Sequence, residues 1–169
     1  MNEWTGDGML PESTLIEAEA LLSACRSKRI MLATAESCTG GLISAALTAI
    51  AGSSDVVDRG FVTYSNQAKS EAIGVPMALI ETHGAVSQQV AAAMAEGALV
   101  RSQAAIAIAV TGVAGPGGGS ADKPVGLVWF GLARTGSPAI TDHKIFPGDR
   151  TEIRAATVAH ALKMIRDSL

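Results

Sequence analysis

The segment 30–51 constrains the fold more than any other part of the chain. It begins with an apolar run, 30–35, passes through the turn Glu36-Ser37-Cys38-Thr39-Gly40-Gly41, and continues into a helical pattern over 42–51. A small, glycine-rich turn between a strand and a helix places backbone N–H groups at a helix N-terminus, where they bind an anion or a developing oxyanion. We therefore interpret this turn as a candidate site. The alternative is a helix cap, because serine and threonine commonly cap helices.

The composition is typical of one globular domain and excludes several classes of protein. Of 169 residues, 48% are hydrophobic and 17% are charged, which argues against disorder. The net charge is −3 with no block of Lys and Arg, so we expect no nucleic-acid partner. No apolar run has the length of a membrane span, and the first residues lack a signal-peptide pattern. We expect a cytoplasmic protein with reduced thiols and no membrane partner.

Metal and cofactor motifs are missing from the sequence. The two cysteines and three histidines are scattered without metal-ligand spacing. No segment ends as a phosphate-binding P-loop does. The glycine-rich stretch 115–119 lacks the last glycine of a dinucleotide fingerprint and leads into a strand pattern rather than a helix. We expect no metal and no cofactor.

Apolar runs, helical periodicity and breaker residues alternate along the chain. The pattern predicts helices over 12–27, 42–51, 66–73, 77–82, 88–102 and 150–168, the last opened by a capping box at 149–152, and strands over 30–35, 60–64, 105–110, 125–133 and 140–146. The last three strands follow one another directly, so some pairing is antiparallel. We expect an α/β fold, a three-layer α/β/α sandwich with a mixed, mostly parallel sheet. Residues 1–11 would form a flexible tail and 12–169 a single domain.

Three segments come directly after predicted strands and carry polar or glycine-rich chemistry: 36–41, 64–69 and 111–120. Ligands collect at the carboxyl ends of parallel strands. If these strands are parallel, the three segments meet in one crevice that would hold Ser37, Thr39, Tyr64, Lys69 and Thr111.

These residue types suit acyl transfer without a metal. A serine hydroxyl needs a neighbouring base, and with no well-placed histidine Lys69 is the first candidate, provided that burial lowers its pKa. Tyr64 would relay the proton or orient the lysine, and His83 is the alternative base. An ion pair with Glu36 would raise the lysine pKa, so we expect Glu36 to face the following helix instead. The alternatives are an ordinary solvated lysine and a tyrosine at the edge of the core.

Two features suggest a ligand with a phosphate. The breaker-rich loop after residue 111 either lets the backbone approach a ligand or is only a wide turn. Arg150 and Arg154 lie four residues apart at a helix start, where cations oppose the helix dipole. A bound phosphate would account for both arginines, and a solvated charged face is the alternative.

Several motifs in one order resemble the CinA C-terminal domain family, which includes nicotinamide-nucleotide amidohydrolases. The motifs are Ala35-Glu36-Ser37-Cys38-Thr39-Gly40-Gly41, Gly60-Phe61-Val62-Thr63-Tyr64-Ser65-Asn66, His83-Gly84-Ala85-Val86-Ser87, and Thr111-Gly112-Val113-Ala114-Gly115-Pro116 with Lys123-Pro124-Val125-Gly126. The resemblance covers residues 12–167, which is nearly the whole chain.

The resemblance implies hydrolysis of the carboxamide of nicotinamide mononucleotide to nicotinic acid mononucleotide and ammonia, in pyridine-nucleotide salvage. It implies a metal-free mechanism with Ser37 as the nucleophile and Tyr64 and Lys69 as its partners. The expected substrate-binding residues are Glu36, Cys38, Thr39, Gly40, Thr111, Gly112 and Arg150. We expect a small-molecule nucleotide as the substrate and a homo-oligomer, dimer or higher. The alternatives are a non-catalytic nucleotide-binding or competence/damage-associated module and an interaction protein that oligomerises through its alanine-rich helices.

Overall fold

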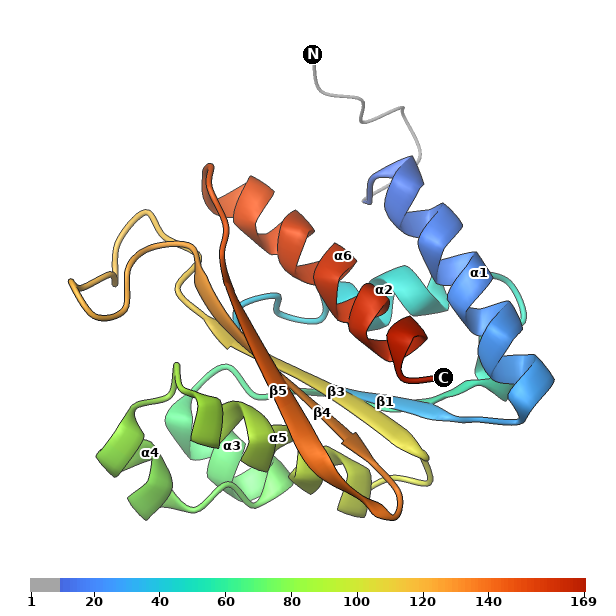
Figure 1. Ribbon diagram of the computed structural model, residues 1–169, viewed down its shortest axis with the longest axis horizontal. Helices are drawn as coiled ribbons and strands as arrows, with labels where there is room; N and C mark the ends of the chain where they lie inside the picture. Colours follow the sequence, from blue (N-terminus) through green and yellow to red (C-terminus); the bar gives the residue numbers. More distant parts are fainter. Residues whose placement is uncertain (1–9) are drawn as a thin grey trace.

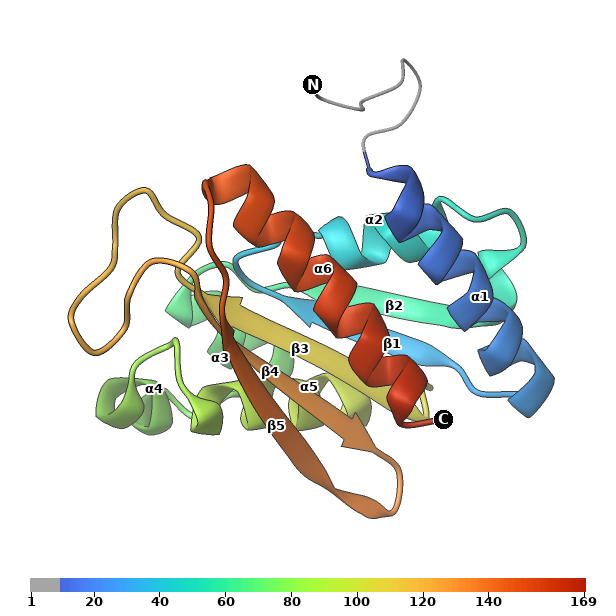
Figure 2. The same cartoon turned by 45° about the horizontal axis from the view of Figure 1, so that its top comes forward.

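A computed structural model describes residues 10–169, and these residues form three layers (Figure 1). A central sheet lies between two groups of helices, as the turned view shows most clearly (Figure 2). One face is covered by α1 (Glu12–Lys28), α2 (Leu42–Thr48) and α6 (Arg150–Asp167), and the other by α3 (Asn66–Ile73), α4 (Met77–His83) and α5 (Gln88–Val100). The predicted α/β/α sandwich is confirmed.

The sheet has five strands in the order β2-β1-β3-β4-β5. β1 is parallel to both of its neighbours, β2 and β3, whereas β4 is antiparallel to β3 and β5, so β4 alone opposes the direction of the other four. The sheet is therefore mixed, with most strands in one direction. The strands are β1 (Leu32–Glu36), β2 (Val57–Val62), β3 (Ile106–Gly112), β4 (Leu127–Arg134) and β5 (Ser137–Ile145).

The element boundaries differ from the sequence prediction by a few residues. The largest shifts of a strand start are in β2 and β5, each of which begins three residues before its predicted start; for β2 that prediction was Gly60. Gly60 lies inside the strand, at a position where a Cβ would overlap the hydroxyl oxygens of Thr34 and Ser44. It therefore marks a close approach of β2 to β1 and α2 rather than a strand start. A short 3₁₀ turn, Ser53–Asp55, precedes the strand.

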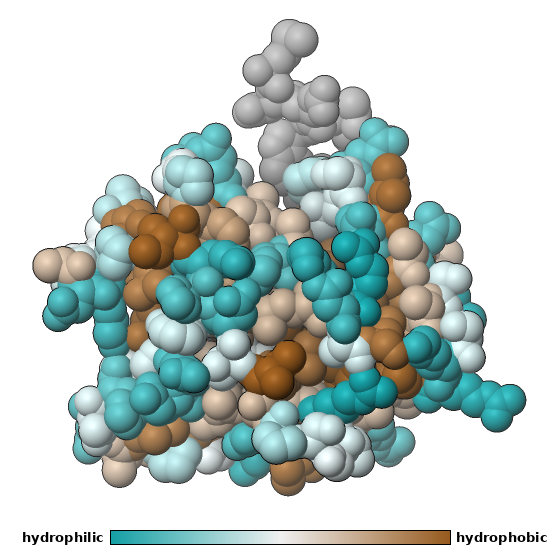
Figure 3. Space-filling model, in the orientation of Figure 1, coloured by the Kyte–Doolittle hydropathy of each residue, from teal (hydrophilic) through white to brown (hydrophobic). Residues whose placement is uncertain are grey.

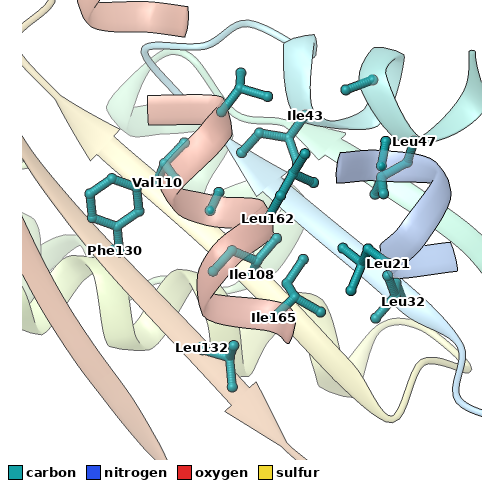
Figure 4. Packing of buried hydrophobic residues seen from close by; sticks show 14 of the residues in the cluster. Leu21, Leu32, Ile43, Leu47, Ile108, Val110, Phe130, Leu132, Leu162 and Ile165 are labelled. Carbon is teal, nitrogen blue, oxygen red and sulfur yellow. The ribbon is translucent and has the colours of Figure 1, made fainter. Parts of the chain in front are cut away.

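Large and small side chains alternate along β3, so the two faces of the sheet there differ in side-chain size. On β3, Ile106, Ile108 and Val110 point into a core shared with α1, α2 and α6, where Leu21 and Leu162 pack (Figure 4). The residues between them, Ala107 and Ala109, face α5 in a second core that contains many alanines. The period of two in a strand produces this division. The small face lets α5 lie close to the sheet, since a Cβ on Gly131 of β4 would overlap the carbonyl of Ala91.

The start of the chain is described only in part. Leu10 packs against the larger core, and Pro11 precedes the first residue of α1. The remainder of the predicted tail, residues 1–9, lies outside the described residues. Within the described part, no helix combines the length and hydrophobicity that a membrane crossing needs. The face in Figure 3 carries both hydrophilic and hydrophobic residues, and hydrophobic side chains reach the surface on the side where the loop 113–126 lies.

Candidate active site

The turn after β1 is tied to the neighbouring strand and closed on itself. The Ser37 N–H donates to the Val110 carbonyl of β3 at 3.1 Å, and the Gly40 N–H donates to the Ser37 carbonyl at 3.0 Å. Gly40 and Gly41 have φ angles of 59° and 107°, a left-handed conformation that glycine adopts without strain. The turn leaves Ser37 8% exposed, with its side chain lining a cavity of about 210 Å³.

The Glu36 side chain links this turn to the first residues of α2. Its Oε1 accepts hydrogen bonds from the Thr39 hydroxyl at 2.6 Å and the Ile43 N–H at 2.8 Å, and its Oε2 accepts from the Ser44 N–H at 3.0 Å. A buried carboxylate at a helix N-terminus is stabilised by the free N–H groups and the helix dipole. Glu36 therefore faces α2, as expected, and not Lys69. Glu36 and Thr39 are fully buried and do not line the cavity, although both were expected to bind substrate.

Lys69 reaches the turn 36–41 from the first turn of α3. This helix begins after Ser65, whose hydroxyl accepts from the Ala68 N–H at 3.0 Å, as the sequence predicts. The lysine is 1% exposed. Its Nζ lies 3.1 Å from Ser37 Oγ and donates to the backbone carbonyls of Thr63 at 2.9 Å and Tyr64 at 3.2 Å.

Burial lowers the pKa of Lys69, because the ammonium ion loses its hydration. A neutral amine has two N–H donors and one lone pair. The two carbonyls can take both N–H groups, which leaves the lone pair for the Ser37 hydroxyl. Cys38 would oppose this shift only as a thiolate, and burial raises the pKa of the Cys38 thiol to about 11. The thiol stays protonated near neutral pH, so Cys38 is a small, neutral part of the cavity wall.

Tyr64 and Arg150 form the exposed side of the cavity. The Tyr64 side chain is 60% exposed, and its hydroxyl accepts from Arg150 Nη2 at 3.2 Å. Arg150 Nη1 donates to the Gly115 carbonyl at 2.8 Å, which links the glycine-rich loop to the rim. The proton relay expected for Tyr64 needs its hydroxyl near the serine. Among the described residues, however, that hydroxyl accepts from Arg150, and Lys69 Nζ donates to the backbone carbonyl of Tyr64 and not to its hydroxyl.

The back of the cavity comes from the end of β3 and from the loop before α5. Thr111 Oγ1 donates to the Ala85 carbonyl at 2.9 Å and so fixes this loop. Gly112 permits a close approach of β4, because a Cβ there would lie 2.8 Å from the Leu127 carbonyl oxygen. Ala85 and Val86 line the cavity, as do Asn66 and Ala114. These four residues lie in motifs quoted from the sequence, but nothing in the sequence marked them individually as part of the cavity wall.

The histidines lie elsewhere. His83 was expected in a loop, but it is the last residue of α4, which Gly84 terminates with a φ of 79°. It borders a separate hollow that includes Trp129 and His143, and those two rings stack with centroids 4.5 Å apart. His160 bonds Asp142 at 2.8 Å. None of the imidazoles of residues 10–169 lines the cavity of Ser37.

Arg154 has a position that sequence reasoning missed. It does not line the cavity beside Arg150. Its Nε donates to the Cys38 carbonyl at 3.1 Å, and its Nη2 donates to the Thr39 carbonyl at 3.0 Å. The spacing of the two arginines correctly indicated a shared helix face, but nothing in the sequence marks backbone carbonyls as acceptors. As to metals, no three His, Cys, Asp or Glu side chains between residues 10 and 169 cluster in a way that could hold an ion.

Comparison with known proteins finds relatives that match most of this chain. A relative from Enterobacter agglomerans named nicotinamide-nucleotide amidohydrolase PncC is 50% identical over 141 residues, covering 83% of this chain and 86% of its own length. A CinA-like protein from Mycolicibacterium vanbaalenii is 48% identical over 163 residues, which are 96% of this chain. The chain spans only 37% of the length of this longer relative.

A solved structure has the same fold along nearly its whole length. The competence/damage inducible protein CihA from Agrobacterium tumefaciens superposes with a TM-score of 0.92 at 50% identity, covering 95% of this chain and 98% of that one. The model of the family described as CinA C-terminal domain matches residues 16–169. The resemblance seen in the sequence motifs is thereby confirmed, and the chain belongs to the CinA C-terminal domain family.

Proposed function

We propose that this chain hydrolyses the carboxamide of nicotinamide mononucleotide to nicotinic acid mononucleotide and ammonia. One observation supports this most directly: the buried Lys69 Nζ lies 3.1 Å from Ser37 Oγ in a cavity at the ends of parallel strands. A hydroxyl and an amine at this distance, with burial favouring the neutral amine, are the two groups that serine acyl transfer needs. The proposed substrate comes from the name of the Enterobacter agglomerans relative, nicotinamide-nucleotide amidohydrolase PncC.

In the first half of the proposed reaction, Ser37 Oγ attacks the carboxamide carbon while its proton passes to Lys69 Nζ. The carbonyl oxygen becomes an oxyanion as the tetrahedral intermediate forms. Among the described residues, the backbone N–H groups of Cys38 and Thr39 have no acceptor on another residue, and they lie directly after the nucleophile. They are the proposed donors to the oxyanion. The C–N bond then breaks, and the nitrogen takes the proton of Lys69 and leaves as ammonia.

In the second half, the nicotinoyl ester on Ser37 is hydrolysed. A water molecule attacks the ester carbon and gives its proton to the neutral Lys69. The C–Oγ bond breaks, and Ser37 Oγ takes the proton back. The product is the carboxylic acid, which ionises in water. The same lysine thus serves as base and then acid in each half, with no metal in any step.

The proposed substrate orientation places the carboxamide on Ser37 and the phosphate on Arg150. The cavity of about 210 Å³ is smaller than most ligand pockets, so it takes the reacting end of the substrate only. Arg150 lies on the exposed side, and its bonds to Tyr64 and Gly115 leave further N–H donors for an anion. Glu36 and Thr39 act in this proposal by supporting the turn.

We further propose that the protein acts in the cytoplasm, in pyridine-nucleotide salvage, as a homo-oligomer without a nucleic-acid partner. The net charge of −3 supports the last point. The edge strand β5 carries two exposed isoleucines, Ile140 and Ile145, which supports an apolar contact between copies. Light scattering of the purified protein tests the oligomer, and a monomer at every concentration would contradict it.

The decisive experiment is an ammonia-release assay on the purified chain. We expect release from nicotinamide mononucleotide, with much less from nicotinamide or glutamine, since neither carries the ribose phosphate. The Ser37→Ala variant serves as the control for contaminating amidases. Binding of the nucleotide without ammonia release would instead support a non-catalytic nucleotide-binding module.

A further inference from the structure

Two arginines one helical turn apart on α6 have different surroundings. Arg150, the first residue of the helix, is exposed and lines the cavity. Arg154 is half-buried and borders a different hollow of about 350 Å³, together with apolar residues that include Leu42 and Val158. The capping box of Asp149 and Glu152 fixes the start of the helix that carries both.

The guanidinium of Arg154 holds two successive peptide groups of the nucleophile turn. Its planar fork presents parallel N–H donors, and it bonds the Cys38 and Thr39 carbonyls at 3.1 Å and 3.0 Å. Thr39 O also accepts the Leu42 N–H at 3.1 Å, so this carbonyl receives two donors. A cation on these carbonyls in a partly apolar setting makes the hydrogen bonds stronger than those between neutral groups.

Holding these carbonyls also determines where the N–H groups point. In a trans peptide the C=O and N–H of one plane point in opposite directions. When the Cys38 carbonyl is bound to Arg154, the Thr39 N–H therefore points away from α6. The next N–H, that of Gly40, is used within the turn on the Ser37 carbonyl. The Cys38 and Thr39 N–H groups remain available, as the proposed oxyanion donors.

We propose that Arg154 is the positioning residue of the nucleophile turn and not a phosphate ligand. It orients and polarises the peptide group between Cys38 and Thr39, whose N–H is one of the two proposed donors to the oxyanion. This inference rests on the proposed amidase function. It assigns to Arg154 an effect on the transition state, because the oxyanion exists only there. Arg150, in contrast, acts on the bound substrate.

The test separates kcat from KM in variants of the full chain with nicotinamide mononucleotide. We expect Arg154→Ala to lower kcat about 100-fold, the range for loss of one oxyanion donor, and to leave KM within about threefold. Arg154→Lys should restore only part of kcat, because an ammonium lacks the planar fork. Added guanidinium should raise kcat of Arg154→Ala and not of the wild type. A purely structural role would not produce this rescue.

Two matched variants on the same helix complete the experiment. Arg166→Ala removes an exposed ion pair with Glu17 and should keep full activity. Arg150→Ala should raise KM. If Arg154→Ala does not fold, the assignment is tested with folded Arg154→Lys, which should have a lower kcat and an unchanged KM. A rise in KM with kcat intact, or a loss of activity that only follows the loss of folded protein, overturns the assignment. If the wild type releases no ammonia, the proposed function fails and the assignment fails with it.

Discussion

The two sides of the cavity differ in how firmly their polar groups are held. On the inner side, Ser37, Lys69 and Thr111 are buried and bonded to neighbouring strands or loops. On the outer side, Tyr64 and Arg150 are exposed and bonded mainly to each other and to a loop. Chemistry needs groups held within fractions of an ångström, whereas recognition of a charged, flexible ribotide tolerates movement. We therefore expect changes on the inner side to affect kcat, and changes on the outer side to affect KM.

The largest effect is expected for Ser37→Ala. Loss of the nucleophile should lower kcat by at least about 10³-fold, because the covalent route disappears. The melting temperature should stay close to that of the wild type, since the serine side chain is small. Steady-state ammonia release measures the effect, and Ser27→Ala on the exposed face of α1 is the matched control. A loss of only a few-fold would exclude Ser37 as the nucleophile.

Lys69→Met should lower kcat nearly as much and should also change the pH profile. Burial lowers the Lys69 pKa, so the fraction of neutral amine rises with pH at lower values than for an ordinary lysine, whose pKa is about 10.4. The wild-type rate should rise with pH through that lowered pKa, and the variant should lack this limb. An unchanged limb in Lys69→Met would show that a group other than Lys69 is the base.

The same variant should change how stability depends on pH. Between the lowered pKa of the folded state and about 10.4, the unfolded chain binds the proton of Lys69 and the folded protein does not. The free energy of unfolding therefore rises with pH across that window. In Lys69→Met this part of the rise should be absent, which urea unfolding at a series of pH values measures.

On the outer side, Arg150→Gln should raise KM for nicotinamide mononucleotide about tenfold and change kcat much less. The reason is the loss of a charge-assisted bond to the phosphate. The nucleoside without phosphate supplies the control, since its KM should not change in the variant. Equal effects on both compounds would show that Arg150 acts on something other than the phosphate.

Tyr64→Phe should have a smaller effect, a few-fold rise in KM. Its hydroxyl bonds Arg150 in the structure, so its removal frees the arginine without touching Ser37. A fall in kcat comparable to that of Lys69→Met would instead support the proton relay expected from the sequence. In that case the tyrosine hydroxyl must move toward the serine when substrate binds.

The smallest effect is expected for metal removal. Each proton in the proposed mechanism moves between Ser37, Lys69, water and the leaving group, so dialysis against EDTA should leave kcat unchanged. The assay is ammonia release before and after dialysis. Inactivation that one added divalent ion reverses would contradict the metal-free proposal.

The sequence revealed the inner side of the site more completely than the outer side. The turn 36–41 was recognisable because a strand pattern, glycines and a helix pattern follow one another. Lys69 was the first candidate for the base, with His83 as the alternative, and the argument that an ion pair would raise the lysine pKa predicted that Glu36 faces the following helix. The partners of Arg154 and of the Tyr64 hydroxyl were not predictable. The acceptors of Arg154 lie 115 and 116 residues away and are backbone atoms, which any residue type provides.

The contrast between large and small side chains on the two faces of the sheet has a consequence for how this family can vary. On the face toward α6, trimming a side chain leaves a void, and the cost depends on how far the neighbours relax. On the alanine-rich face the destabilising change is the opposite one, because a larger side chain would overpack the contact between the sheet and α5. A methyl group at Gly131 would meet the Ala91 carbonyl and push α5 outward. The loop that supplies Ala85 and Val86 leads directly into that helix. A side chain at Gly131 would therefore move the helix that follows Ala85 and Val86, and we expect such a change to alter the shape of the cavity.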